Sequence, residues 1–252
     1  MITQLTTDPA VPGANEDAAG ALASIAVLAD GAGIPHRFRA GCRHSVAWYS
    51  HQLTARLLTA ALDETVSLTA AAAQAITEVA SLHQEECDLA AGSPSATLVA
   101  VRVIDEQLEH LVLCDSSLLI EHPDGTVTRL ADDRADRLRL PDPTPEAVEA
   151  QRNAPGGFWV ARHEPEAAAE ALAGTTPLRD ITAVHLVSDG ITRTVDLLRT
   201  HDESELAAAL SADPRGLIRQ LRTAERALPA ERRPRKIHDD ATVVTLTMAP
   251  EG

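Results

Sequence analysis

The stretch ATLVAVRVIDEQLEHLVLCDSSLLIEH, residues 96–122, decides the fold class. It contains three short runs rich in branched apolar residues, at 96–104, 108–114 and 117–122. Runs of this length and composition are typical of β-strands rather than helices. Asp124-Gly125 is a typical hairpin turn, and a further strand is predicted after it at 126–130. The middle of the chain is therefore predicted to form an antiparallel meander.

Further strands and several helices are predicted on both sides of this meander. Short apolar runs predict buried strands at 21–29, 183–188 and 241–248. Apolar residues at helical spacing and local composition predict helices at 43–62, 65–90, near 144–153, near 165–172, 203–211 and 214–228. Strands thus lie near both ends of the chain, with helices between them. We predict one α+β domain, residues 1–252, whose first and last strands share a sheet.

The composition excludes several classes of partner. The chain has 252 residues, 44% of them hydrophobic, and a formal net charge of −15. Binding to nucleic acid or to an anionic membrane surface depends on Lys and Arg, so we expect neither partner. Residues 1–18 lack the basic start and apolar run of a signal peptide, and no apolar stretch is long enough to span a membrane. A cytoplasmic location is the expectation.

The cysteine and histidine spacings do not indicate a zinc site. Cys42, Cys87 and Cys114 are far apart and odd in number. No CxxC pair is present, so neither a zinc site nor a disulfide framework is predicted. The histidines form no HxH or HExxH pattern, and a histidine-based zinc site is not expected either.

Four aspartates stand out by their positions. Asp30 and Asp189 end apolar strands in two similar turns, VLADG and LVSDG, while Asp17 follows Asn-Glu and Asp239 precedes the last strand. If the strands at 21–29 and 183–188 lie side by side, their carboxylates converge. Carboxylates suit Mg²⁺ or Mn²⁺, and one that bridges two ions gives a hydrolytic two-metal site. Each Asp-Gly alone is an ordinary turn, so the prediction depends on the whole set.

These aspartates belong to a set of six short motifs that follow one another in a particular order along the chain. The motifs are NEDA at 15–18, ADGAG at 29–33, PSATL at 94–98, CDSS at 114–117, SDG at 188–190 and DDATVV at 239–244. Together they resemble the ordered motifs of the PPM, or type 2C, metal-dependent Ser/Thr protein phosphatases, over about residues 5 to 248. The resemblance implies a four-layer α-β-β-α sandwich of two antiparallel sheets flanked by helices, with the metals at one end between the sheets.

The resemblance also implies a role for each matching residue. Asp30 corresponds to the carboxylate that bridges two Mn²⁺ or Mg²⁺ ions, and Gly31 to the residue that offers a backbone carbonyl. Asp189 and Asp239 correspond to the remaining direct ligands, and Asp17 to a ligand that acts through water. The implied reaction is direct attack of metal-activated water on a phosphoserine or phosphothreonine ester of a protein substrate.

The chain departs from the family pattern at the phosphate-binding arginine. Pro12 occupies the position of an arginine that grips phosphate, and proline offers no such contact. Arg37, Arg39 and Arg43 follow the ADGAG turn and are candidates to replace it, although a basic surface loop explains them as well. The same holds for His238, which adjoins Asp239 and is a candidate phosphate contact, with an ordinary loop histidine as the alternative.

The motifs at the metal end depart as well. The DGxGG pattern ends in Gly33-Ile34, and GDSR becomes CDSS, which keeps Asp115. Arg193 replaces a carboxylate that the family uses with that aspartate for a third, weaker metal site. A guanidinium cannot bind a metal, so we predict that the third site is absent and that Arg193 pairs with Asp115. These changes leave a rival function open, a phosphatase-like regulatory or binding module with little turnover. A phosphatase of another phosphorylated substrate is a further alternative.

Overall fold

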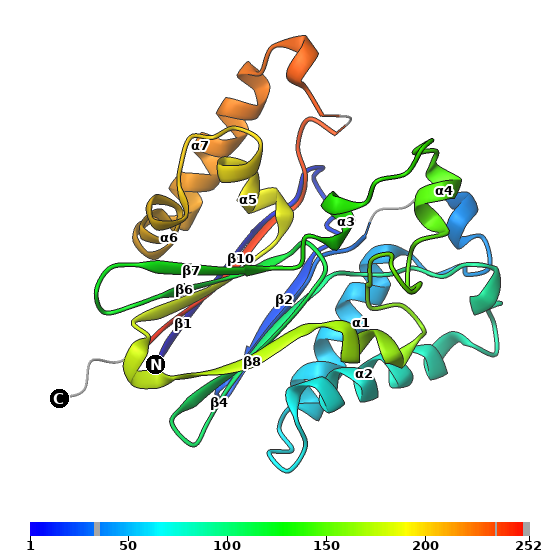
Figure 1. Ribbon diagram of the computed structural model, residues 1–252, viewed down its shortest axis with the longest axis horizontal. Coiled ribbons are helices and arrows are strands. Elements are labelled where there is room, and N and C mark those ends of the chain that lie inside the picture. Colours follow the sequence, from blue (N-terminus) through cyan, green and yellow to red (C-terminus); the bar gives the residue numbers. More distant parts are fainter. Residues whose placement is uncertain (33–35, 235, 249–252) are drawn as a thin grey trace.

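A computed structural model describes residues 1–32, 36–234 and 236–248 of the chain (Figure 1). Two five-stranded sheets, antiparallel at every pairing, form its centre. The first sheet has the order β1 (Ile2–Asp8), β10 (Ala241–Thr247), β9 (Ala183–Val187), β6 (Ser117–Glu121), β7 (Val127–Ala131). The second has the order β2 (Ala18–Leu22), β3 (Ile25–Ala29), β4 (Leu98–Ile104), β5 (Gln107–Leu113), β8 (Leu172–Pro177).

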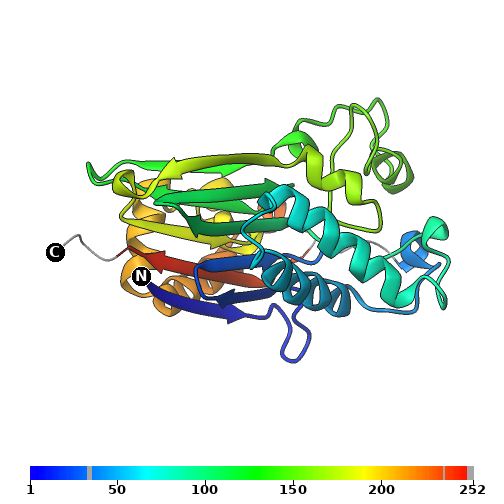
Figure 2. The same ribbon diagram turned by 90° about the horizontal axis from the view of Figure 1, so that it is seen from below.

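Helices cover the outer face of each sheet. The pair α1 (Val46–Ala60) and α2 (Leu68–His83) packs on the second sheet, and α5 (Asp189–Asp196), α6 (Glu203–Ala212) and α7 (Pro214–Ala227) pack on the first. Figure 1 shows the two helical layers on opposite sides of the sheets, and Figure 2 shows the same layers from below. The predicted four-layer α-β-β-α sandwich is confirmed.

Three apolar clusters hold the layers together. Strand β3 shows how: Ile25, Val27 and Ala29 face α1 and α2, whereas Ala26 and Leu28 face the other sheet. All five residues of this strand are buried, which is why its sequence is a continuous apolar run rather than an alternating one. The outer helices bury Leu206, Leu210, Leu217 and Leu221 against the first sheet. The site end of the sandwich is thus fixed by strands buried on both faces.

Short elements complete the chain. Helices α3 (Arg134–Arg137) and α4 (Pro145–Glu149) lie in the segment between β7 and β8. Turns of 3-10 helix occur at His36–Arg39, Leu89–Ala91, Pro165–Glu170, Leu178–Asp180 and Ala230–Arg232. Within the described ranges, no helix is long and apolar enough to cross a membrane.

Strands β1 and β8 and helices α3 and α5 were not predicted from the sequence. Strands β1 and β8 are edge strands with mostly exposed or half-exposed side chains, so they lack an apolar signal and depend on backbone pairing. Helix α5 begins at Asp189 itself, where the sequence indicated only a turn. The predicted strand at 21–29 is a hairpin, because Ala23 takes a positive φ of 52° and separates β2 from β3.

The prediction that the first and last strands share a sheet needs correction in one respect. Strand β10 does pair with the first strand of the fold, which is β1 and not the predicted segment 21–29. Residues 21–29 lie in the other sheet, so they do not share a sheet with 183–188 either. The position beside β10 is taken by the polar edge strand β1, whereas the apolar pattern had assigned it to 21–29.

Candidate metal centre

Asp30 and Asp189 meet although their strands lie in different sheets. Asp30 directly follows β3, and Asp189 follows Ser188 at the end of β9 and begins α5. The backbone N–H of Asp189 donates to Oδ2 of Asp30 over 3.4 Å. The strands do not lie side by side, which was the condition stated for convergence, but their carboxylates converge because the two sheets face each other at this end.

Asp17 joins Asp30 through the hairpin of the second sheet. It immediately precedes β2, and Ala18 pairs with Ala29, so Asp17 and Asp30 lie at the same end of two neighbouring strands. Asp17 is 3% exposed, and both of its carboxylate oxygens are buried without a hydrogen bond of good geometry from any described group. A buried carboxylate with this lack of donors is costly unless a cation compensates it.

Burial and mutual repulsion raise the pKa of all three carboxyl groups when no metal is bound. Burial, together with the charge of Asp240, raises the pKa of Asp17 to about 6. Burial and the charges of Asp115 and Asp239 raise the pKa of Asp189 to about 7. The pKa of Asp30 lies well above its usual range, through burial and then the charges of Asp17, Asp189 and Asp115. A divalent cation would replace these protons and relieve the repulsion.

Asp239 is held differently from the other three aspartates. Its Oδ2 lies 2.8 Å from Nη2 of Arg193, and its Oδ1 lies 3.2 Å from Nζ of Lys236. Arg193 also pairs with the buried Glu225, at 3.0 Å. The prediction that Arg193 pairs with Asp115 is therefore wrong. The guanidinium reaches the neighbouring Asp239, because Glu225 of α7 holds it from the other side.

A cavity of about 730 Å³ opens over this cluster. Its lining includes four of the carboxylates, namely Asp30, Asp115, Asp189 and Asp239. Its cationic side chains are Arg152, Arg193 and Lys236. The centre therefore combines carboxylates that suit a hard divalent cation with cations that suit a phosphate group.

Comparison with known proteins identifies the family of the chain. The family profile described as Protein phosphatase 2C matches residues 13–224. The chain belongs to the protein phosphatase 2C family. No curated protein matches the sequence.

Solved phosphatases share the fold at low identity. The Mycobacterium tuberculosis serine/threonine phosphatase PstP/Ppp is 21% identical with a TM-score of 0.64, over 97% of each chain. A structure of the PstP catalytic domain in complex with two manganese ions is 21% identical with a TM-score of 0.60, over 97% of this chain and 96% of that one. Stp1 from Staphylococcus aureus is 16% identical with a TM-score of 0.62, over 99% and 95%.

Glycine at position 31 is required by close packing. A Cβ there would lie 2.5 Å from Cγ1 of Val46 and 2.7 Å from the carbonyl oxygen of Glu16. Only glycine fits between α1 and the NEDA segment, and it lines the cavity directly beside Asp30. Gly33 and Ile34, where the chain departs from the DGxGG pattern, lie outside the described residues.

The CDSS motif carries backbone strain at its first residue. Cys114 has a φ of 69°, in the left-handed region that glycine favours, and this is the position where the family pattern has glycine. Asp115 follows it on the cavity wall, and burial raises its pKa. The chain thus keeps the unusual backbone conformation that presents Asp115 although the glycine is replaced.

The four candidate phosphate contacts, Arg39 among them, do not line this cavity. Arg37 pairs with Glu146 at 2.9 Å, and Arg43 pairs with Glu86. His238 lies 2.6 Å from Glu225 through its Nδ1 atom. Arg37, Arg43 and His238 are therefore each engaged with a glutamate outside the carboxylate cluster.

The cavity cations Arg152 and Lys236 were not predicted from the sequence. Arg152 is held by Glu149 at 2.9 Å and lies 5.1 Å from the centre of the Phe158 ring. It belongs to the polar segment between β7 and β8, whose composition gives no sign that it folds over the carboxylates. Lys236 stands in a Pro/Arg-rich loop that reads as ordinary surface. No local pattern distinguishes either residue.

Proposed function

We propose that the chain is an active metal-dependent phosphatase that hydrolyses phosphoserine and phosphothreonine esters of protein substrates, acting as one domain. The convergence of Asp17, Asp30 and Asp189 carries this proposal, above all the buried oxygens of Asp17, which accept no hydrogen bond of good geometry from the described residues. Family membership and the two manganese ions in the PstP structure support two Mn²⁺ or Mg²⁺ ions here.

The proposed ligands follow the family pattern residue by residue. Asp30 would bridge the ions, Gly31 would offer its carbonyl, Asp189 and Asp239 would bind directly, and Asp17 would act through water. Ions bound there would supply an activated water for direct attack on phosphorus and would neutralise phosphate charge. The chain's own contribution is to hold the carboxylates at the end of the rigid sheets and to line the same cavity with the cationic side chains of Arg152 and Lys236.

The state of Asp239 favours a second candidate, a phosphatase-like binding module with little turnover. Both of its oxygens are paired with cations, so a metal would compete with Arg193 and Lys236 for them. Pro12 also removes the arginine that members of the family use to grip phosphate. In such a module the cations would compensate the acidic cluster in place of a metal.

Hydrolysis assays separate the two candidates. p-Nitrophenyl phosphate and a phosphothreonine peptide are incubated with Mn²⁺, with Mg²⁺ and with EDTA, using the intact protein and Asp30→Asn. Asp124→Asn is a matched control, because Asp124 lies in an exposed turn. Turnover should require metal, and Asp30→Asn should reduce it by about 10²–10³-fold or more, whereas the control should not. Folded protein without metal-dependent turnover on either substrate would reject the enzyme and favour the binding module.

A further inference from the structure

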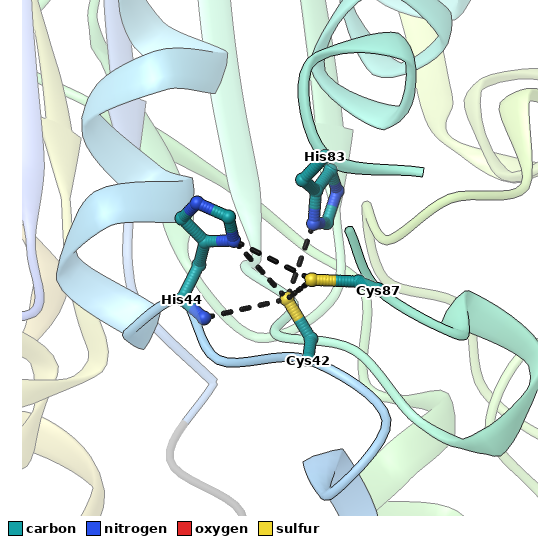
Figure 3. A group of neighbouring side chains, drawn as sticks. All are labelled: Cys42, His44, His83 and Cys87. Atoms are coloured by element: carbon teal, nitrogen blue, oxygen red, sulfur yellow. Dashed lines mark hydrogen bonds between the residues drawn. The ribbon is translucent and has the colours of Figure 1, made fainter. Parts of the chain in front are cut away.

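Four side chains form a second cluster beside α1 and α2, apart from the carboxylates. Cys42 and His44 lie just before α1, His83 ends α2, and Cys87 follows it (Figure 3). The figure shows the two sulfur atoms and the facing ring nitrogens directed at one another. Their potential ligand atoms all lie within 4.8 Å of one another.

The separations suit a tetrahedral metal site. Sγ of Cys42 lies 3.1 Å from Nδ1 of His83 and 3.5 Å from Nδ1 of His44, and Sγ of Cys87 lies 3.6 Å from Nδ1 of His44. Zinc–sulfur and zinc–nitrogen bonds at tetrahedral angles place sulfur and nitrogen about 3.6 Å apart and two sulfurs about 3.8 Å apart. The sulfurs are 3.0 Å apart, so they would separate by less than an ångström around an ion.

We propose that Cys42, His44, His83 and Cys87 bind one Zn²⁺ ion, through the two sulfurs and Nδ1 of each histidine. Two thiolates with two imidazoles form a donor set that selects zinc over Mg²⁺ or Mn²⁺. On binding, the two thiols release their protons, and the two thiolates neutralise the ion. The site then carries no net charge, which suits its position: Cys42 and His83 are 3% and 1% exposed.

The ligands come from two loops that glycine allows to approach closely. The backbone N–H of Asp88 donates to the carbonyl of Gly41 over 2.9 Å. A Cβ on Gly41 would lie 2.0 Å from the carbonyl oxygen of Asp88, and one on Gly92 would lie 2.2 Å from that of Phe38. The pairs Cys-x-His and His-x3-Cys meet through this contact. The prediction that the chain has no zinc site therefore rested on spacings that cannot reveal a site split between two loops.

The site would anchor the loops that lead away from Asp30. Thr97 donates its N–H to the carbonyl of Asp30 over 2.8 Å, and Ala32 donates to the carbonyl of Ser95 over 3.0 Å. The same two chain segments continue to Cys42 and to Cys87. A zinc ion would fasten them a second time, so its role is structural and it contacts no substrate.

Zinc content and cobalt spectroscopy test the proposal. The protein, purified under reducing conditions and reconstituted with Zn²⁺, should contain one zinc per chain, and Cys87→Ser and His44→Gln should each lose it. Cys114→Ser and the exposed His51→Gln are matched controls that should retain it. Asp30→Asn should also retain it, which separates this site from the carboxylates. Substituted Co²⁺ should show thiolate charge-transfer bands and the visible bands of tetrahedral cobalt.

Trp48 gives an independent measure of affinity. Its ring lies 4.1 Å from that of His44 and 5.1 Å from that of His83, so zinc binding should change its fluorescence. A dissociation constant of about 50 nM or tighter is expected for a structural zinc site. A free Zn²⁺ concentration a hundredfold above that constant should raise the Tm by about 5–10 °C. Weaker binding, zinc that stays in Cys87→Ser, or a Cys42–Cys87 disulfide that forms in preference would each overturn the proposal.

Discussion

The two clusters differ in what happens to them without a metal. The carboxylates of Asp17, Asp30 and Asp189 repel one another, and burial raises the pKa of each. The thiols and imidazoles of the Cys42 cluster are linked by weak hydrogen bonds, while Nε2 of His83 is buried without a partner among the described residues. The cluster carries no charge near neutral pH, since burial lowers the pKa of His83 to about 4. In the first cluster, a bound cation would relieve the repulsion between the carboxylates. The second cluster is neutral, so a bound ion would stabilise it only through the new metal–ligand bonds. This difference leads to distinct behaviour of the metal-free protein.

The largest expected effect is a loss of metal-free stability as the pH rises. The folded pKa values of Asp17, about 6, and Asp189, about 7, exceed that of an unfolded aspartate, so the folded state binds more protons in this window. In EDTA the free energy of unfolding should fall by about 3–4 kcal/mol from Asp189 alone between about pH 4 and 7, and then level off. Urea unfolding at several pH values measures it.

Asp189→Asn isolates this contribution from those of other groups. His83 acts in the opposite direction, because its lowered pKa costs stability as the pH falls toward 4. The difference in the free energy of unfolding between the intact protein and the variant, taken at each pH, should therefore give the contribution of Asp189. Mn²⁺ should flatten the curve of the intact protein, since the ion replaces the protons. Identical pH dependence in the two proteins would mean that Asp189 titrates normally.

Neutral substitutions in the two clusters should have different effects on the metal-free protein. Asp30→Asn removes a repelled, buried charge and should raise the free energy of unfolding in EDTA by about 1–3 kcal/mol. Cys87→Ser replaces a neutral thiol and should change the zinc-free value by less than about 1 kcal/mol. Chemical denaturation of both variants at pH 8, after removal of all metal, makes the comparison.

Equal effects would remove the distinction between the clusters. If Asp30→Asn were destabilising, its carboxylate would already be compensated by groups of the chain. If Cys87→Ser lowered the free energy of unfolding by several kcal/mol without zinc, the Cys42 cluster would be a hydrogen-bonded part of the core rather than a metal site.

The sequence revealed one cluster and concealed the other for a physical reason. Asp30 and Asp189 follow buried strands, so a local pattern of apolar residues, Asp and Gly marks them. The four residues of the second cluster are brought together by contacts between loops, which no local pattern records. The same limit explains β1 and β8, which depend on backbone pairing, and the partner of Arg193, which Glu225 on a distant helix determines. The sandwich itself was implied by the resemblance of the six ordered motifs to the PPM family, whereas the apolar runs alone predicted an α+β domain with an antiparallel meander.

The smallest expected effect concerns the cations that already compensate the acidic cluster. Lys236 holds one oxygen of Asp239, and its side chain is half exposed, so the pair contributes at most about 1 kcal/mol. Lys236→Met should therefore lower the Mn²⁺ concentration needed for half-maximal turnover by about two- to fivefold, because Asp239 becomes easier to engage. Arg179→Met, which removes the same charge at an exposed pair elsewhere, should leave this concentration unchanged. A rise in KM with an unchanged Mn²⁺ requirement would instead show that Lys236 binds phosphate. The cations of this cluster would then serve to bind substrate and would not take the place of a metal.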